Sequence, residues 1–373
     1  MSLPKPEIRV VISGGGTGGH IFPAIAIANA LKQANAANDV LFVGANGRME
    51  MEKVPAAGYR IEGLPISGIQ RKLTLSNLLV PFKALKSLMM AKSILKKFKP
   101  DAAVGVGGYA SGPLLYAATS LKIPSLIQEQ NSFAGITNKF LAKRVQKICV
   151  AYEDMERSFP GAASKIVMTG NPVRQDITLP QNRDEARNFF GLDAGKKTIL
   201  VIGGSLGART INESISAGLA AVAKENVQLI WQTGKHYHPQ AKQAAAPYSA
   251  QGIMAFDFIQ RMDLAYAAAD IVVSRAGASS VSELCLVARP AVLVPSPNVA
   301  EDHQTKNAMA LVRKKAALLV KDADAREWLV KVSLDLVKDE KQQEELRKNI
   351  GAMALPGSAN QIVEEIYSLV NRS

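Results

Sequence analysis

Residues 10–30 read VVISGGGTGGHIFPAIAIANA, and residues 199–219 read ILVIGGSLGARTINESISAGL. Each stretch passes from a short β-branched run, typical of a buried strand, through a glycine loop into a segment of helical length. A strand that runs through a glycine loop into a helix is typical of a doubly wound α/β domain. Its occurrence twice predicts an α/β protein with two such domains that face each other across a deep cleft.

Short apolar runs alternate with amphipathic segments along the rest of the chain, which predicts parallel sheets covered by helices. Strands are expected at residues 8–12, 40–43, 102–106, 125–128, 147–150, 198–202, 228–232, 271–274 and 291–294. A further strand-like run, KIVMTG, ends in the turn residues Gly170–Val173, so we expect domains at residues 1–172 and 173–356. A last helix at about Asn360–Val370 follows the break LPGS.

Composition limits the class of protein. Among 373 residues, 47% are apolar and 21% are charged, which excludes a disordered or fibrous chain. The two cysteines lack Cys-x-x-Cys spacing, so a disulfide scaffold is excluded and a reducing compartment is favoured. With no leader and no apolar run of about 18 residues, we expect a cytoplasmic protein without a membrane span. The net charge of +13 favours an anionic partner, but an aromatic content of only 6% ranks nucleic acid last.

The first glycine loop is SGGGTGGH. Because glycine lacks a Cβ atom, the backbone of this loop can come close to an anion bound at the start of the following helix. Gly14, Gly16 and Gly19 match the G-x-G-x-x-G dinucleotide pattern, but LFVGANGR supplies no acidic residue after the second strand, which disfavours a nicotinamide cofactor. A tight turn without a ligand is the alternative. His20 ends the loop and is a candidate general base, with a structural role as the alternative.

Three segments of the second half carry candidate binding groups. GGSLGA at 203–208 can hold phosphate, with Ser205 as a hydroxyl donor, or form an ordinary turn. SRAGASSVSE at 274–283 places a carboxylate on a helix, where it can bind ribose hydroxyls or face solvent. The polar cluster Asp302, His303, Gln304 and Asn307 can bind sugar hydroxyls or cap a helix.

A basic amphipathic segment covers residues 75–99. Apolar residues recur at helical spacing among lysines, which suits either an anionic membrane surface or an ordinary buried face. The candidate membrane patch consists of Leu75, Leu79, Phe82, Lys83, Leu85 and Lys86.

Seven motifs in order carry a resemblance over nearly the whole chain. They are GGGTGGH (14–20), GVGGYASGP (105–113), QEQNSFAGITNKFLAK (128–143), TGNPVR (169–174), GGSLGA (203–208), RAGASSVSE (275–283) and EDHQTKNA (301–308). The chain resembles the MurG family, bacterial UDP-N-acetylglucosamine:lipid I N-acetylglucosaminyltransferases of peptidoglycan synthesis. The resemblance implies the GT-B fold, with the donor nucleotide held mainly by the C-terminal domain and a last helix, residues 357–373, that crosses back to the N-terminal domain.

The resemblance also implies roles for individual residues. The donor UDP-GlcNAc is expected at Thr17, Gly18, Gly19, Asn131, Arg174, Ser205, Ile259, Ala278, Ser279, Ser280, Val281, Ser282, Glu283 and Gln304. Gly14, Gly15, Gly16 and Tyr109 match the acceptor and phosphate loops, and His20 matches the proposed base. Leu206 stands where many relatives carry Gln, so one polar contact is expected to be weaker, while the backbone donors of the loop remain.

The implied reaction is inverting transfer of GlcNAc to the C4 hydroxyl of MurNAc in lipid I, giving β-1,4-linked lipid II. No obligatory metal or other cofactor is expected, because Asp322 and Asp324, the only D-x-D pair, suit a helix N-cap and the His236/His238 pair has no third ligand nearby. The implied location is the cytoplasmic face of the inner membrane, as a peripheral protein on the anionic leaflet, with cell-wall synthesis and division proteins as candidate partners.

Three alternatives stay open from the sequence. A related GT-B glycosyltransferase could act on another lipid or small-molecule acceptor, a nonenzymatic scaffold could retain the fold, and an NAD-dependent oxidoreductase is a distant third. GGYASGP and QEQN argue against the first, and the set His20, Asn131, Glu283 and Gln304 argues against the second.

Overall fold

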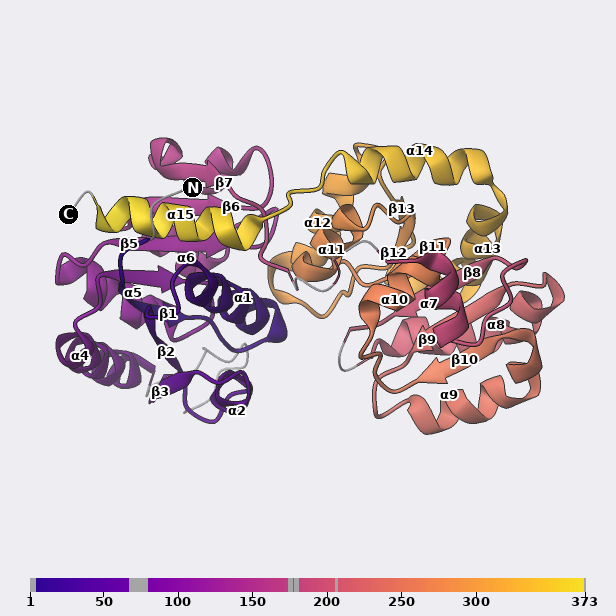
Figure 1. The fold of residues 1–373 in the computed structure, drawn as a ribbon, viewed down its shortest axis with the longest axis horizontal. Helices are drawn as coiled ribbons and strands as arrows, with labels where there is room; N and C mark the ends of the chain where they lie inside the picture. The colour runs from indigo at the N-terminus through magenta and orange to yellow at the C-terminus, as the bar shows by residue number, and fades with distance from the viewer. Residues whose placement is uncertain (1–4, 67–79, 174–176, 178–180, 205–206, 372–373) are drawn as a thin grey trace. The chain divides into compact units, whose positions relative to one another are not determined.

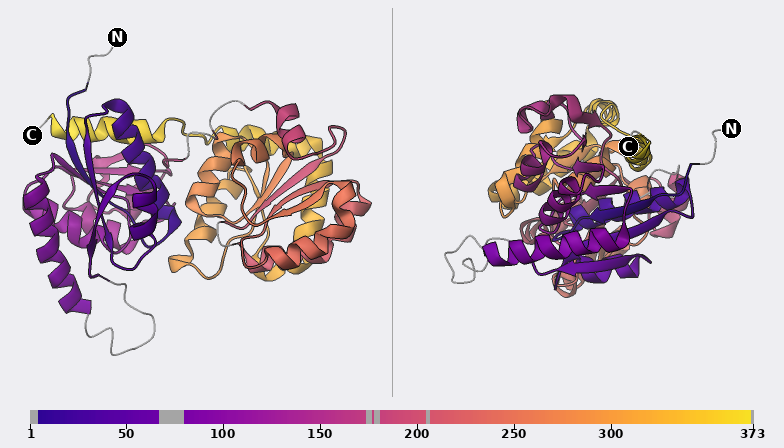
Figure 2. Two further views of the ribbon diagram at one scale, coloured as in Figure 1. Left: turned by 60° about the horizontal axis from the view of Figure 1, so that its bottom comes forward. Right: turned by 90° about the vertical axis from the view of Figure 1, so that its left-hand side faces the viewer.

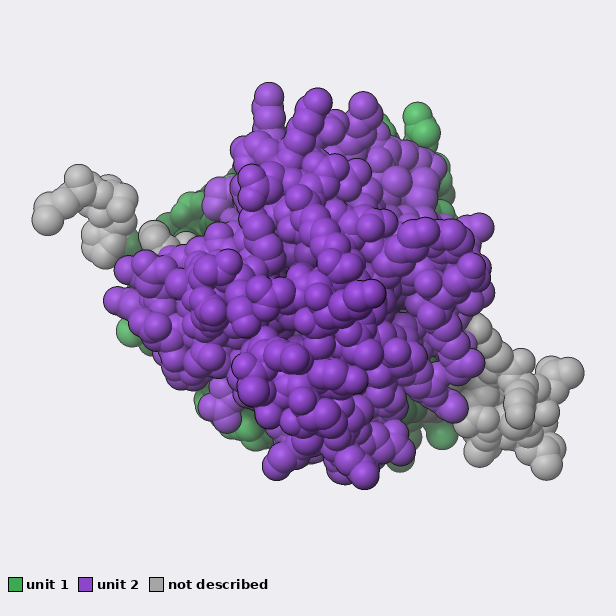
Figure 3. Space-filling model, turned by 90° about the vertical axis from the view of Figure 1, so that its right-hand side faces the viewer, with its two compact units in different colours: residues 1–173, 357–373 green, residues 174–356 purple. Residues whose placement is uncertain are grey.

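The computed structural model describes residues 5–66, 80–173, 177, 181–204 and 207–371. The chain divides into two compact units, unit 1 with residues 1–173 and 357–373 and unit 2 with residues 174–356 (Figure 3). Sequence reasoning placed the boundary after residue 172. In each unit helices cover a parallel sheet (Figure 1), so the predicted α/β class with two Rossmann-like domains is confirmed.

Unit 1 is built on a seven-stranded sheet with the order β3-β2-β1-β4-β5-β6-β7. Its strands are β1 (Arg9–Ser13), β2 (Asp39–Ala45), β3 (Arg60–Leu64), β4 (Ala102–Gly105), β5 (Ser125–Glu129), β6 (Lys147–Val150) and β7 (Ile166–Met168). Its helices are α1 (Gly18–Ala34), α2 (Glu50–Ala56), α4 (Val80–Phe98), α5 (Ser111–Ser120), α6 (Ile136–Ala142) and α15 (Ser358–Val370). The core forms where β-branched residues of β1 and β4 meet the buried face of α1.

Unit 2 is built on a six-stranded sheet with the order β10-β9-β8-β11-β12-β13. Its strands are β8 (Thr198–Ile202), β9 (Gln228–Gln232), β10 (Ile253–Phe256), β11 (Ile271–Ser274), β12 (Ala291–Leu293) and β13 (Leu318–Leu319). Its helices are α7 (Arg183–Phe189), α8 (Arg209–Lys224), α9 (His238–Ala245), α10 (Met262–Ala268), α11 (Ala278–Leu286), α12 (His303–Val312), α13 (Ala325–Lys338) and α14 (Glu340–Gly351). Trp231 of β9 is fully buried at the centre of this core.

The last helix, α15, belongs to unit 1 although unit 2 precedes it in the chain (Figures 1 and 2). Its apolar face, with Ile362 and Ile366, is buried in the core of unit 1 beside α1. The amide of Asn38 donates to the Tyr367 hydroxyl at 2.8 Å, and Lys147 pairs with Glu365 at 3.2 Å. Burial of an apolar face is the main source of helix stability, so these contacts explain why the chain returns to unit 1 after unit 2.

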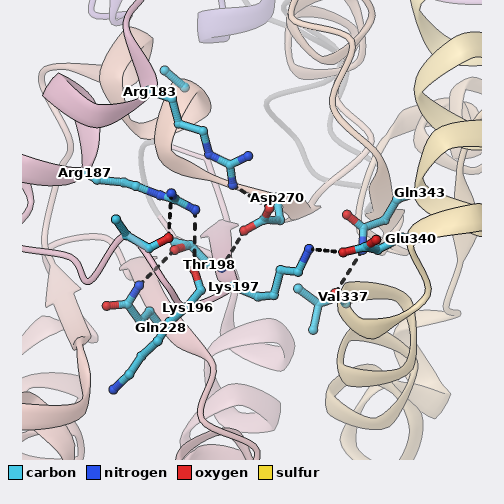
Figure 4. Close-up of polar contacts among 12 residues, drawn as sticks. Arg183, Arg187, Lys196, Lys197, Thr198, Gln228, Asp270, Val337, Glu340 and Gln343 are labelled. Atoms are coloured by element: carbon cyan, nitrogen blue, oxygen red, sulfur yellow. Dashed lines mark hydrogen bonds and ion pairs between the residues drawn. The ribbon is translucent and has the colours of Figure 1, made fainter.

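Polar side chains fix the amino-terminal edge of the unit 2 sheet (Figure 4). The buried carboxylate of Asp270 accepts from the backbone N–H of Thr198 at 2.8 Å and pairs with Arg183 of α7. The Gln228 amide donates to the Thr198 hydroxyl at 3.3 Å. These hydrogen bonds and this ion pair connect α7, β8, β9 and the residue before β11 at the strand beginnings.

The two cysteines are free thiols, Cys149 in β6 and Cys285 in α11. Burial raises the pKa of each to about 12. Since the thiolate is the nucleophilic form, neither side chain is a nucleophile at neutral pH.

Candidate functional site

Both glycine loops leave their sheets where the strand order reverses. In unit 1, β1 lies between β2 and β4, and in unit 2, β8 lies between β9 and β11. Ligands of open α/β sheets bind at the carboxyl ends of the strands at such reversal points. Each unit therefore has one candidate edge of its own.

In unit 1 the loop after β1 packs against the loop after β4. The backbone N–H of Gly15 donates to the Gly107 oxygen at 3.3 Å. A Cβ atom on Gly108, whose φ is +89°, would lie 2.4 Å from the Gly15 oxygen, so only glycine fits there. The predicted acceptor-loop residue Tyr109 follows directly and is exposed. The structure thus brings the GGGTGGH and GGYASGP motifs into backbone contact.

His20 lies in the first turn of α1, and its ring is held by both loops. Its Nδ1 lies 3.0 Å from the Gly15 oxygen and 3.4 Å from the Thr17 hydroxyl. The ring also packs against Gly107, where a Cβ atom would come within 2.7 Å of its Cδ2. Because a carbonyl oxygen can only accept a hydrogen bond, the contact assigns the proton to Nδ1 and leaves Nε2 as the basic nitrogen of the neutral ring.

The start of α1 is suited to an anion. Thr17 at the N-cap makes no side-chain cap bond, and the first turn, with Gly18 and Gly19, contains no acidic residue. The N-terminal backbone N–H groups of a helix carry partial positive charge. The predicted contacts of Thr17, Gly18 and Gly19 therefore lie where a phosphate or a sugar oxygen would be stabilised.

Sequence reasoning missed Glu50, the first residue of α2, which lies beneath the first glycine loop. Its carboxylate accepts from the backbone N–H of Gly16 at 2.8 Å and from that of Ala45 at 3.0 Å. The side chain is 1% exposed. The segment LFVGANGR contains no acidic residue, but Glu50 places a carboxylate next to the end of β2. This carboxylate binds backbone N–H groups of the protein and does not face a ligand, as the acidic residue of a dinucleotide site does.

The QEQN motif forms a hydrogen-bond network at the end of β5. Glu129 accepts from the backbone N–H of Asn131 at 3.1 Å and from the Asn138 side chain at 2.8 Å. Gln130 donates to the Val106 oxygen at 2.7 Å, and Gln128 donates to Asn171 at 2.9 Å. This network joins the QEQN motif to TGNPVR and holds Asn131, the predicted donor contact, in a partly exposed position.

In unit 2 the loop after β8 also requires glycine. At Gly207, with φ +79°, a Cβ atom would lie 2.0 Å from the Thr233 oxygen. Gln232 of β9 donates to the Gly204 oxygen at 3.3 Å and accepts from the Ile259 N–H at 3.0 Å. The N–H of Ile259, a predicted uracil contact, is therefore bound within the protein.

The predicted ribose helix is α11, which begins at Ala278. Its N-cap residue is Gly277, which has no side chain to cap the helix, and its first turn, with Ser279 and Ser280, contains no acidic residue. Glu283 lies further along the helix and accepts from the Tyr266 hydroxyl at 3.0 Å. Tyr266 of α10 is buried, so a fixed donor orients the carboxylate that was predicted to bind ribose. Sequence reasoning missed this partner.

The polar cluster after β12 lies at the start of α12. Gln304 accepts from the Ser296 N–H at 2.9 Å. Asp302 holds the N-cap position and accepts from the Thr305 hydroxyl at 2.7 Å. Asn307 is buried and donates to the Ala276 oxygen at 3.2 Å, which connects α12 to the loop before α11. The structure thus brings Gln304 and the α11 loop to one edge of the sheet.

The D-x-D pair is part of the structure of unit 2. Asp322 pairs with Arg275 and accepts from the Thr210 hydroxyl at 3.0 Å. Asp324 occupies the predicted N-cap position of α13 but makes no side-chain cap bond. Within the described part of the chain, no three His, Cys, Asp or Glu side chains gather in a way that could hold a metal ion.

Four of the predicted site residues lie outside the described residues. They are Leu75, Leu79, Arg174 and Ser205.

Helix α4 packs against α5 and lies on the outer side of unit 1 (Figure 2). Several of its large apolar side chains are exposed. Phe82, Leu85 and Met89 are 73%, 57% and 59% exposed. Lys86 beside them is also exposed, and Lys83 is partly exposed. Of the helices that the structure describes, none has the length and apolar character needed to cross a membrane.

Family models match both units. The glycosyltransferase family 28 N-terminal domain matches residues 10–150, and the family 28 C-terminal domain matches residues 198–362.

Close relatives share the full length of the chain. A protein of Parabacteroides distasonis is 56% identical, with 98% of this chain and 99% of that protein covered. A protein of Cytophaga hutchinsonii is 57% identical over 100% of this chain and 99% of its own length. Both are named UDP-N-acetylglucosamine–N-acetylmuramyl-(pentapeptide) pyrophosphoryl-undecaprenol N-acetylglucosamine transferase.

Solved structures show the same fold. The crystal structure of Acinetobacter baumannii MurG superimposes with a TM-score of 0.78 at 28% identity, covering 97% of this chain and 100% of that one. A UDP-N-acetylglucosamine 2-epimerase, at 14% identity and a TM-score of 0.66 over 99% of this chain and 97% of that one, shares the fold alone.

Proposed function

The chain belongs to glycosyltransferase family 28, and we propose that it transfers GlcNAc from UDP-GlcNAc to the C4 hydroxyl of MurNAc in lipid I. The product is β-1,4-linked lipid II, so the transfer inverts the anomeric centre. The observation that carries this proposal is 56–57% identity, over 98–100% of the chain, to proteins named as N-acetylglucosamine transferases of this reaction. Among the alternatives, a GT-B enzyme with another acceptor is not favoured by these relatives.

Unit 2 is assigned the donor nucleotide. The start of α11 supplies backbone N–H groups for the pyrophosphate, and Glu283 binds the ribose hydroxyls in the orientation that Tyr266 fixes. The Ile259 carbonyl oxygen accepts from the uracil N–H, since its own N–H is bound by Gln232. Gln304 contributes a donor-sugar contact from α12.

Unit 1 is assigned the acceptor and the base. His20 takes the proton from the C4 hydroxyl at Nε2, which its Nδ1 contact with Gly15 leaves as the basic nitrogen. The hydroxyl oxygen attacks the anomeric carbon from the face opposite UDP, and the bond to the diphosphate breaks. Helix N-termini stabilise the departing negative charge without a metal ion.

The first test is transfer of labelled GlcNAc from UDP-GlcNAc to a short-chain lipid I analogue in the presence of EDTA. We expect full activity in the chelator and little transfer from UDP-glucose or UDP-GalNAc. Binding of UDP without transfer would retain the nucleotide assignment and reject lipid I as the acceptor. Activity that EDTA abolishes and Mg²⁺ restores would reject the metal-free mechanism.

The acceptor implies a membrane surface, because an undecaprenyl chain stays in the bilayer. The exposed face of α4, here called the α4 patch, consists of Phe82, Lys83, Leu85, Lys86 and Met89. Its apolar groups enter the acyl boundary while its lysines contact anionic headgroups, each contributing about 1 kcal/mol. On this basis we propose that the enzyme works at the cytoplasmic face of the inner membrane as a peripheral protein, with cell-wall synthesis and division proteins as candidate partners.

A double variant tests the α4 patch. Phe82→Asp with Leu85→Asp is expected to lower binding to phosphatidylglycerol vesicles by about 100-fold or more, since each lost apolar group removes about 1.5–3 kcal/mol of burial. Flotation or sedimentation measures the binding. Trp328→Asp changes an exposed apolar residue of unit 2 and serves as the matched control. Wild-type vesicle binding by the double variant would refute the docking role of α4.

A further inference from the structure

A buried carboxylate and the proposed base bind the same peptide unit. Glu50 Oε2 accepts from the Gly16 N–H at 2.8 Å, and the Gly15 oxygen contacts His20 Nδ1 at 3.0 Å. The Gly15 oxygen and the Gly16 N–H are the two polar ends of one planar amide. The arrangement is thus a chain of hydrogen bonds from the carboxylate through the peptide to the imidazole.

The chain around Glu50 is shaped to hold this contact. The carboxylate is 1% exposed, and its other oxygen is bound by the Ala45 N–H at 3.0 Å. A Cβ atom on Gly15 would lie 2.2 Å from Glu50 Oε1, and one on Gly44 would lie 2.6 Å from its Cγ. Two glycines therefore make the space into which this one side chain fits.

We propose that Glu50 is a positioning residue that sets the orientation and the basicity of His20 through the Gly15–Gly16 peptide. A hydrogen bond at the N–H end of an amide polarises it, so that its oxygen becomes a stronger acceptor. A stronger acceptor at Nδ1 stabilises the imidazolium that forms when Nε2 takes a proton. The catalytic part of this inference rests on the proposed function, because it assumes that His20 is the base.

The other groups at this edge are engaged differently. The remaining contacts described for the ring, the Thr17 hydroxyl and the Gly107 backbone, do not titrate in the working range. Glu129, the other buried carboxylate, is bound by the Gly135 N–H at 3.0 Å and by Asn138. On α2 itself, Glu52 is exposed and pairs with Lys53 at 3.3 Å. The contact that reaches His20 through a peptide is that of Glu50.

The test compares Glu50→Gln with Glu52→Gln, which removes the same charge from the exposed side of the same helix. NMR titration gives the pKa of His20, one of four histidines, assigned from the spectrum of a His20→Gln variant. We expect Glu50→Gln to lower the pKa of His20 by about half a unit or more and Glu52→Gln to leave it unchanged. Because a base is active above its pKa, the acid limb of the kcat profile should move to lower pH, with KM for UDP-GlcNAc unchanged.

A folded Glu50→Gln protein with the wild-type His20 titration would overturn the proposal. If Glu50→Gln does not fold, the wild-type protein supplies the test. The NMR chemical shifts of the Gly15 carbonyl carbon and the Gly16 amide nitrogen should change with pH at the same midpoint as the His20 ring. The absence of that shared midpoint would overturn the proposal. The NMR titration requires no acceptor. A wild-type enzyme that fails to use lipid I would therefore reject the proposed function without deciding the coupling between Glu50 and His20.

Discussion

His20→Ala is expected to lower kcat by about 10²–10⁴-fold while the affinity for UDP-GlcNAc stays close to that of the wild type. The imidazole is held from two loops, by the Gly15 oxygen at 3.0 Å and by the backbone of Gly107. This fixed ring offers Nε2 to the acceptor hydroxyl, and alanine offers no group in its place. Steady-state kinetics with a short-chain lipid I analogue, together with calorimetric titration of UDP-GlcNAc, separate the two effects.

His236→Ala is the matched control, because His236 is exposed and lies before α9 in unit 2. Its kcat should equal that of the wild type. A His20→Ala enzyme with nearly unchanged kcat would mean that another group takes the proton and that His20 only supports the loop. A raised KM for UDP-GlcNAc with unchanged kcat would instead indicate a donor contact.

The central strands of both sheets could be predicted from sequence, and the edge strands were harder to find. The strands expected at 198–202 and 271–274 are buried throughout, and the strand expected at 8–12 is buried except for the partly exposed Arg9. All three therefore form nearly continuous apolar runs. The strands that were not predicted, β3, β10 and β13, all lie at sheet edges and are only partly buried. An edge strand needs fewer apolar residues, so its pattern does not stand out from that of a loop.

The glycine loops and His20 could be predicted because each is a local pattern of consecutive residues. Glu50 could not, since its partner Gly16 is 34 positions away in the sequence. The segment after β2 was expected to lack an acidic group, but the turn into α2 brings Glu50 back to Ala45. Tyr266 was missed for the same reason, because only the fold brings this residue of α10 to Glu283 of α11, 17 positions away in the sequence.

Glu283→Gln is expected to raise KM for UDP-GlcNAc by about 10–100-fold with little change in kcat. A hydrogen bond to a charged group contributes about 1.5–3 kcal/mol, and the ribose contact is present in both the ground state and the transition state. Tyr266→Phe should give a smaller increase, since it removes only the 3.0 Å bond that orients the carboxylate. Glu340→Gln is the matched control. Glu340 is exposed and pairs with Lys197, the residue before β8, at the opposite edge of the sheet, so kcat and KM should both stay unchanged.

Analogues of UDP-GlcNAc whose ribose lacks hydroxyl groups test whether Glu283 contacts the ribose or whether its substitution only disturbs the packing of α11. If the Glu283 carboxylate binds the hydroxyls, the wild-type enzyme should discriminate against 2′,3′-dideoxy-UDP-GlcNAc, and Glu283→Gln should lose most of that discrimination. The substitution and the missing hydroxyls would then be non-additive, as expected for two groups in contact. If the variant discriminates as strongly as the wild type, the carboxylate does not touch the ribose. Its bond to Tyr266 would then serve only to join α10 to α11.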